Sequence, residues 1–487
     1  MLDSLIVALM LLGTGSTSGE LPFWASSNRF GLMPQFNGTA AVLNARTEFD
    51  ETETLQWRAG LSFAANLESA ADNASPSGFS PRGAGMLDEF YGSCRWKAFT
   101  IDCGIMHRER DFTAPGDGFL GSLSSTSGNL AWSSNARSMP GYSITLAPVP
   151  VPFTGDRFCI YGRYGDYRTL DDRYVKDALM HNMQVGFLFH IGGRLDFRIA
   201  LDHYALWGGV SPVYGAMPLT FDNYVRMATG SSASKSGNGS ESDKINVIGD
   251  QRGAELFRFD WRGDGWVLTF QHDIPYDDGS GMGFQNFPDG VNTLHFGWND
   301  RNRWISDILV EYATTMWQSG TYHDKMVDGR RVIFGGIDNY FTNEEYRSAW
   351  TAYGRTIGLP VFFPSGTRSG SWRQGALTYG VENNRTRYLH IGMAGKLFRV
   401  APYRFVFTAS HNYGTYTNPY KGESQIYREW GTVKETPLFQ ISAGFEGEIP
   451  SLFGIERLSL DYGVYSDRGE VLRNSFGALL GMRVKIY

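Results

Sequence analysis

The sequence predicts an all-β fold, in which a single antiparallel β-barrel crosses a membrane. Three observations predict it. Apolar and polar residues alternate over unusually long segments, aromatic residues flank the short turns between these segments, and aromatic residues and glycine are abundant. The chain has 487 residues, of which 15% are aromatic, and it contains 59 glycines. This composition favours strands that are joined by many turns.

The segment from Thr54 to Leu67 shows the alternation most clearly. Every second residue from Leu55 onward is apolar, and the positions between them are mostly small or polar. Strands in soluble proteins usually have about 5–6 residues, whereas a tilted strand needs about 9–11 residues to cross a bilayer. We therefore expect one face of this strand to meet lipid and the other to face a wet interior. Because lipid offers no partners to backbone groups, the sheet must close on itself.

Aromatic residues flank the short turns between the predicted strands. Trp96 and Phe99 enclose the turn Lys97–Ala98, and Trp261 and Trp266 enclose another. Transmembrane barrels carry aromatic girdles at both membrane interfaces and have short turns at their periplasmic end. A large soluble sandwich or propeller would also alternate, but the strand length and the flanking aromatic residues favour the membrane barrel.

The remaining segments complete a single domain. Asn474–Tyr487 alternates and predicts the last strand, and the low-complexity stretch Gly230–Lys244 predicts an outward loop. We see no linker after the N-terminal segment, so residues 20–487 are predicted to form one barrel.

The first residues predict a signal peptide over residues 1–19. Leu5–Leu12 is a short apolar stretch, and small residues follow it from Gly13 to Gly19, although Asp3 precedes it where a Lys or Arg is usual. The apolar stretch is too short to cross a bilayer as a helix. No other apolar run in the chain approaches about 18 residues, so we expect no helical membrane span.

Composition and motifs exclude several classes of function. The net charge of −6 gives no reason to expect nucleic acid as a partner. The three cysteines form no CxxC pair, and the nine histidines show no HxxxH or HEXXH spacing. The stretch 276–290 is rich in Asp and Gly but lacks the ligand spacing of an EF-hand, and turn formation explains it. We expect no metal site, no cofactor and no enzymatic activity.

Eight segments resemble the Wzi family of outer-membrane proteins that assemble capsules. They follow one another along nearly the whole chain, and the third contains the pattern His-x3-Trp-Gly-Gly. The segments are Gly19–Gly31, Gly128–Tyr142, Leu201–Pro218, Asp277–Gly290, Glu311–His323, Gly335–Pro360, Glu382–Gly395 and Ser410–Tyr416.

The resemblance implies one barrel of about 18 strands with long extracellular loops, in the outer membrane of a Gram-negative bacterium. It also implies a lectin-like role, the attachment of capsular or other surface polysaccharide to the cell, without catalysis. The expected partners are that polysaccharide, outer-membrane lipid and, during biogenesis, the barrel-assembly machinery. Relatives carry a periplasmic helical bundle near the N-terminus. Pro22–Asp50 is too short and too aromatic for such a bundle, so we do not expect one here.

The candidate glycan-binding residues lie within these segments. Tryptophan could stack on the apolar face of a sugar, and arginine could bind uronic acids through paired hydrogen bonds. The same residues could equally pack or form ion pairs inside the barrel. The alternative function is a porin or substrate-selective diffusion channel, which would need an open lumen. The candidates are Arg137, His203, Trp207, Trp317, Asp338, Tyr340, Trp350, Asn384 and Arg385.

Overall fold

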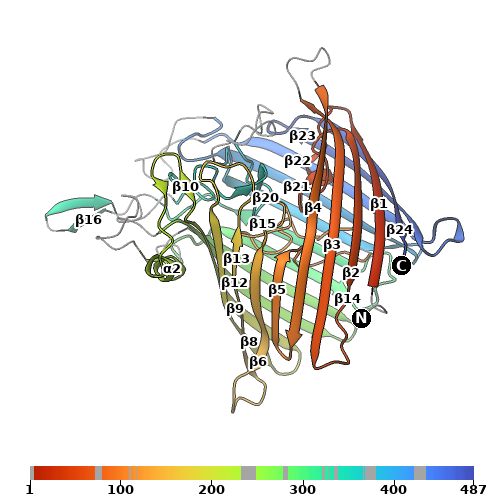
Figure 1. Ribbon diagram of the computed structural model, residues 1–487, viewed down its shortest axis with the longest axis horizontal. Helices are drawn as coiled ribbons and strands as arrows, with labels where there is room; N and C mark the ends of the chain where they lie inside the picture. The colour runs from red at the N-terminus through yellow and green to blue at the C-terminus, as the bar shows by residue number, and fades with distance from the viewer. Residues whose placement is uncertain are drawn as a thin grey trace.

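The computed structural model is a closed barrel of 18 antiparallel strands (Figure 1). This confirms the predicted fold class. The structure describes residues 5–71, 79–108, 111–116, 118–231, 248–277, 283–320, 324–327, 329–333, 338–365, 367, 380–421 and 435–487. Most of the predicted loop Gly230–Lys244 lies outside the described residues.

The wall strands follow one another around the barrel in chain order, and the last pairs with the first. They are β1 (Leu5–Ser16), β2 (Gly38–Thr47), β3 (Leu55–Ala71), β4 (Phe79–Trp96), β5 (Phe99–Ile105), β6 (Gly141–Pro150), β7 (Phe158–Arg168), β8 (Leu179–Ile191), β9 (Leu195–Trp207), β12 (Asp250–Gly263), β13 (Trp266–Tyr276), β14 (Gly290–Trp298), β15 (Asp307–Thr314), β20 (Arg385–Leu397), β21 (Ala401–Gly414), β22 (Leu438–Ile449), β23 (Leu458–Gly469) and β24 (Ser475–Lys485).

The other elements are short and lie in the connections. In the part of the chain that the structure describes, three small hairpins pair β10 (Val210–Ser211) with β11 (Gly215–Ala216), β16 (Asp324–Val327) with β17 (Arg330–Ile333), and β18 (Thr351–Ala352) with β19 (Arg355–Thr356). The helices in that part are α1 (Phe23–Ser26), α2 (Phe221–Ala228) and the 3-10 turn η4 (Leu452–Gly454). Among the described residues, no helix is both long and apolar enough to cross a membrane.

Strand β1 closes the barrel, and here the structure differs from the predicted signal peptide. Leu11 lies opposite Ala41 of β2 on one side and opposite Met482 of β24 on the other. Leu11 faces outward, whereas Met10 and Leu12 face inward and pack against apolar residues that fill the lumen. Both faces of this strand are therefore apolar. Apolar and polar residues therefore do not alternate along β1, and its sequence resembles the apolar core of a signal peptide.

The other strands alternate as predicted. In β3, the outward side chains of Trp57 and Phe63 are 54% and 51% exposed, whereas Ser62 and Ala64 are buried inside the barrel. Glycines on the inward face make room for aromatic rings of the neighbouring strand. A Cβ atom on Gly60 would lie 2.3 Å from the ring of Tyr91, so no larger residue fits there.

The two ends of the barrel differ in the length of their connections (Figure 1). Short turns, such as Lys97–Ala98 between β4 and β5, lie at the end where β1 begins and β24 finishes. Trp96, Phe99 and Trp261 stand exposed beside these turns, as the sequence predicts for an interface girdle. The opposite end, here called the long-loop end, carries the long connections.

Three of these connections fold back into the lumen and occupy much of it. We call the described parts of residues 17–37, 106–140 and 338–365 the plug. Their apolar side chains form two cores with inward-facing wall residues: one core joins Leu21, Trp24, Ala25, Met33, Leu120 and Leu123 to Leu309, Val406 and Leu479, and the other joins Leu130, Ala131, Tyr340, Phe341, Trp350 and Phe362 to Tyr167, Tyr204 and Tyr388.

Polar side chains of the wall hold the plug backbone in place. Glu311 accepts a hydrogen bond from the Ser125 N–H (2.8 Å), and Asp273 accepts one from the Leu130 N–H (2.8 Å). Arg404 donates to the Ser122 carbonyl (2.7 Å). Because buried polar groups are costly unless they are paired, these contacts make the plug a fixed part of the structure.

Removal of residues 1–16 tests the role of β1. We expect the truncated chain not to form a stable barrel, because β2 and β24 would each be left with an unpaired edge in lipid. The measurement is heat-modifiable migration of the refolded protein in semi-native gel electrophoresis. A truncated chain that refolds as well as the full chain would contradict a structural role for this strand.

A second test concerns the charged contact between plug and wall. Glu446 binds both Arg29 of the plug and Arg404 of the wall, and all three side chains are buried. Glu446→Gln leaves two buried guanidinium groups without a carboxylate, a change that costs about 3–5 kcal/mol. We expect faster proteolytic cleavage within residues 17–37 while the barrel itself stays folded. Glu48→Gln, which breaks the exposed pair with Arg46, should leave the cleavage rate unchanged.

Candidate functional site

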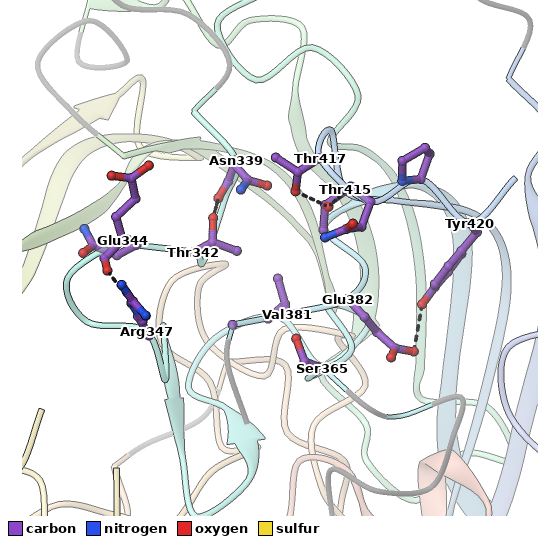
Figure 2. A pocket seen from close by; sticks show the side chains of 14 residues that line it. Asn339, Thr342, Glu344, Arg347, Ser365, Val381, Glu382, Thr415, Thr417 and Tyr420 are labelled. Atoms are coloured by element: carbon purple, nitrogen blue, oxygen red, sulfur yellow. Dashed lines mark hydrogen bonds between the residues drawn. The ribbon is translucent and has the colours of Figure 1, made fainter. Parts of the chain in front are cut away.

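The long-loop end contains a polar depression that we call the bowl (Figure 2). Its volume is about 750 Å³, within the range of about 300–1,000 Å³ that is typical of ligand pockets. The bowl is lined by Asn339, Thr342, Asn343, Glu344, Arg347, Ser365, Gly380, Val381, Glu382, Thr415, Thr417, Asn418, Pro419 and Tyr420.

The side chains of the bowl offer many hydrogen-bonding groups. Thr415 and Thr417 share a hydrogen bond of 3.1 Å, and the Tyr420 hydroxyl donates to Glu382 (3.2 Å). Arg347 and Thr417 are exposed. Hydroxyl, amide and carboxylate groups can donate to and accept from a ligand that itself carries many hydroxyl groups.

The floor of the bowl rests on two of the sequence-predicted site residues. The Asn384 side-chain amide donates to the Asn339 side-chain oxygen (2.8 Å) and to the Tyr340 carbonyl (2.8 Å). Asn384 and Tyr340 are both fully buried. They therefore position Asn339, and neither has a surface that a ligand in the bowl can contact.

The Asp289 carboxylate connects several chain segments beneath the floor of the bowl. Its carboxylate accepts hydrogen bonds from the N–H groups of Trp317 (2.9 Å) and Gln318 (2.8 Å) and from the Tyr340 hydroxyl (3.1 Å). Burial raises the pKa of the Asp289 carboxyl to about 7, although these hydrogen bonds act in the opposite direction. Gln318 in turn donates to the Asn384 carbonyl (3.0 Å). Segments far apart in the sequence are thus tied together at one point.

Asp338 and Arg385 lie in the same region. Asp338 accepts hydrogen bonds from the side chains of Asn286 (2.9 Å) and Ser319 (2.9 Å). The Arg385 guanidinium pairs with Glu435 (2.7 Å).

Arg385 also lies 4.2 Å above the ring of Tyr416, whose hydroxyl donates to the Trp317 carbonyl (3.1 Å). The structure thus brings five of the nine predicted residues together beneath and beside the bowl: Trp317, Asp338, Tyr340, Asn384 and Arg385.

His203 and Trp207 belong to a different cluster, on β9 beside α2. The ring of His203 is hydrogen-bonded to the side chain of Gln251. Trp207 is buried and packs with Met227 and Ile248. Both residues hold the connection after β9 against the wall.

Trp350 and Arg137 lie apart from the bowl lining as well. Trp350 is fully buried, and its indole N–H donates to the Ala131 carbonyl inside the plug (2.6 Å). The Arg137 guanidinium lies 4.2 Å above the ring of Tyr353. Both contacts join two parts of the plug.

The sequence analysis did not single out the residues that line the bowl. Thr342 and Arg347 lie in a segment that it flagged, Gly335–Pro360, but Thr417 and Tyr420 follow the last flagged segment. Residues in irregular loops show no periodic pattern. The sequence feature that could have indicated these residues is the high frequency of Asn, Thr and Tyr in residues 339–347 and 415–420.

Sequence comparison does not place this chain in a family. The chain matches no protein-family model, and no curated protein matches it. Comparison of structures does find similar barrels. Wzi, described as an outer membrane protein involved in group 1 capsule assembly in Escherichia coli and a carbohydrate-binding β-barrel, has a TM-score of 0.51 and 13% identity, over 98% of this chain and 84% of that chain.

Two barrels from Pseudomonas aeruginosa show a weaker likeness. OccK5 (OpdH) has a TM-score of 0.45 and 9% identity, over 100% of this chain and 99% of that one. OpdK, solved with vanillate, has a TM-score of 0.45 and 9% identity, over 99% of each chain. No functional argument rests on scores this low. The likeness to Wzi shows the fold alone, which is that of an 18-stranded outer-membrane β-barrel.

Proposed function

We propose that this protein is a non-enzymatic barrel of the Gram-negative outer membrane that attaches or organises capsular or other surface polysaccharide. In this proposal the polysaccharide binds in the bowl. The long-loop end faces the cell exterior and the short turns face the periplasm, which is the usual arrangement of outer-membrane barrels.

The observation that carries the proposal is a polar bowl set above a lumen that the plug occupies. Large barrels without a plug leave an aqueous channel, whereas here two apolar cores join the plug to the wall. The fold thus presents a rigid polar surface at the long-loop end. The description of Wzi, a barrel of similar fold, as carbohydrate-binding adds support of a weaker kind.

The chemistry of the bowl suits a hydroxyl-rich ligand that carries some negative charge. Arg347 can bind a uronic acid carboxylate through two parallel hydrogen bonds. Glu344 and Glu382 can accept from sugar hydroxyls, and Thr417 can donate or accept. The ring of Tyr420 offers one apolar surface at the side of the bowl.

The alternative function is a diffusion channel. One observation favours it: a cavity of about 660 Å³ lies inside the barrel, beside the plug and against strands β1 to β4 and β24. A channel would need this cavity to connect with both ends of the barrel.

Substitutions in the bowl test polysaccharide binding. Arg347→Ala combined with Thr417→Ala should weaken the binding of purified capsular polysaccharide fragments by roughly tenfold or more, because each lost hydrogen bond costs about 1–2 kcal/mol. Isothermal titration calorimetry with the detergent-solubilised protein measures this. In cells that lack the wild-type protein, the double variant should shift capsule from washed cells to the medium at unchanged total.

Arg194→Ala is the matched control, because Arg194 is an exposed arginine at the short-turn end. It should bind and retain capsule as the wild-type protein does. Equal capsule retention by wild-type, control and bowl variants would refute the proposed role of the bowl.

Conductance in planar bilayers separates the two functions. We expect the purified barrel to show no stable open-channel steps, because the plug is bound to the wall by buried polar and apolar contacts. Replacement of residues 22–34 by a short Gly-Ser linker removes part of the plug and should open a conducting pore. Stable, ohmic steps from the intact protein would favour the channel.

A further inference from the structure

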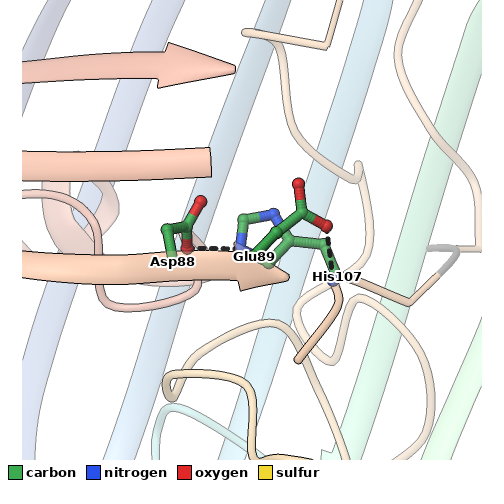
Figure 3. Close-up of side chains that lie close together, drawn as sticks. All are labelled: Asp88, Glu89 and His107. Carbon is green, nitrogen blue, oxygen red and sulfur yellow. Dashed lines mark hydrogen bonds and ion pairs between the residues drawn. The ribbon is translucent and has the colours of Figure 1, made fainter. Parts of the chain in front are cut away.

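The cavity inside the barrel holds a cluster of possible metal ligands that is separate from the bowl. Asp88 and Glu89 come from β4, and His107 follows the end of β5 (Figure 3). One ligand atom from each of these residues lies within 4.8 Å of the other two. All three residues line the cavity of about 660 Å³ beside the plug.

A β-bulge places both carboxylates on the inward face. In regular β structure, adjacent residues point to opposite faces of the sheet. Here Ser62 of β3 pairs with Glu89 and Phe63 pairs with Leu87, so that Asp88 is the extra residue. Leu87 and Phe90, on either side of the two carboxylates, both face lipid. Bulges often redirect side chains in this way at functional sites.

Hydrogen bonds orient His107 toward the two carboxylates. Its ring Nε2 lies 2.8 Å from an oxygen of Asp88, and its backbone N–H donates to Glu89 (2.8 Å). The ring of Phe30, in the plug, stacks on the imidazole with 3.8 Å between ring centroids. The imidazole is therefore held from both sides.

Each carboxylate is also held by a second polar side chain. Ser62 donates to the outer oxygen of Asp88 (2.9 Å), and Asn44 donates to the outer oxygen of Glu89 (3.3 Å). The other oxygen of each carboxylate faces His107. Such outer hydrogen bonds orient ligands in metal sites and leave one oxygen of each carboxylate directed at the ion.

The charges around the cavity leave these two carboxylates without a guanidinium partner. Five arginines line the cavity, and in the part of the chain that the structure describes none forms an ion pair with Asp88 or Glu89. The arginines contact other groups: Arg29 with Glu446, Arg46 with Glu48, Arg58 with Asp102, Arg108 with Trp132 and Tyr167, and Arg483 with Asp461.

We propose that Asp88, Glu89 and His107 bind a divalent transition-metal ion, for which Zn²⁺ is the best match. One imidazole nitrogen and two carboxylate oxygens are ligands that Zn²⁺ accepts at about 2.0–2.2 Å. Binding of the ion replaces the hydrogen bond between His107 Nε2 and Asp88, and a water molecule supplies the fourth ligand. The ion links the start of one plug segment to the wall. This inference does not depend on the function proposed above.

The test uses the full chain in detergent after removal of metal by a chelator. Isothermal titration calorimetry with Zn²⁺ should show one site per chain, and Zn²⁺ should raise the melting temperature. His107→Gln and Glu89→Gln should each weaken Zn²⁺ binding by about tenfold or more, since loss of even an outer hydrogen-bonding partner costs about 10–100-fold. Semi-native gel electrophoresis checks that each variant is folded.

His190→Gln is the matched control. His190 also lies beside a carboxylate, that of Asp196 (2.7 Å), but Asp196 is bound by Arg262 as well. This variant should bind Zn²⁺ as the wild-type protein does. Should a ligand variant fail to fold, Asn44→Ala, which removes only an outer hydrogen bond, should still weaken binding.

Three outcomes would overturn the inference. They are the absence of saturable Zn²⁺ binding, wild-type affinity in folded His107→Gln, and tighter binding of Ca²⁺ or Mg²⁺ than of Zn²⁺. The last outcome would mean that the carboxylate oxygens bind the ion without the imidazole nitrogen.

Discussion

Closure of the sheet governs how both the wall and the lumen of this barrel are built. In lipid, an open sheet edge leaves backbone groups without partners, so β1 must pair with β24 as well as with β2. Closure then creates an enclosed inward face of 18 strands, on which Glu311, Asp273 and Arg404 are buried. Backbone groups of the plug pair with these side chains, and this is why wall and plug form one body.

The bowl is a consequence of the same arrangement. Its floor is held from below by Asn384, Tyr340 and Asp289, which are buried and bonded to one another or to shared partners. A surface built on such a network is rigid before a ligand arrives, so less conformational freedom is lost on binding. The predicted residues that the structure gathers here support the surface, whereas polar loop residues such as Arg347 and Thr417 form it.

A small irregularity in the wall changes its chemistry locally. Without the bulge opposite Ser62, Asp88 and Glu89 would point to opposite faces, and one charge would lie in lipid. The bulge directs both charges toward His107, eighteen positions further on from Glu89 in the chain. No spacing rule for metal ligands covers such a pair of neighbours on a strand, and for this reason the sequence predicts no metal site.

The amino-acid sequence alone predicts the wall strands other than β1. Alternation such as that of Leu55 to Leu67, and aromatic residues beside the turns, are local properties that follow from contact with lipid on one side. It did not show β1 as a strand, because Met10 and Leu12 meet the apolar plug and not water. The sequence analysis flagged the segments that contain Trp317, Tyr340 and Asn384. It predicted neither the supporting role of these residues nor the place of Thr417 and Tyr420 in the bowl. These points depend on contacts between residues far apart in the chain, which no local pattern records, so they emerge only from the folded structure.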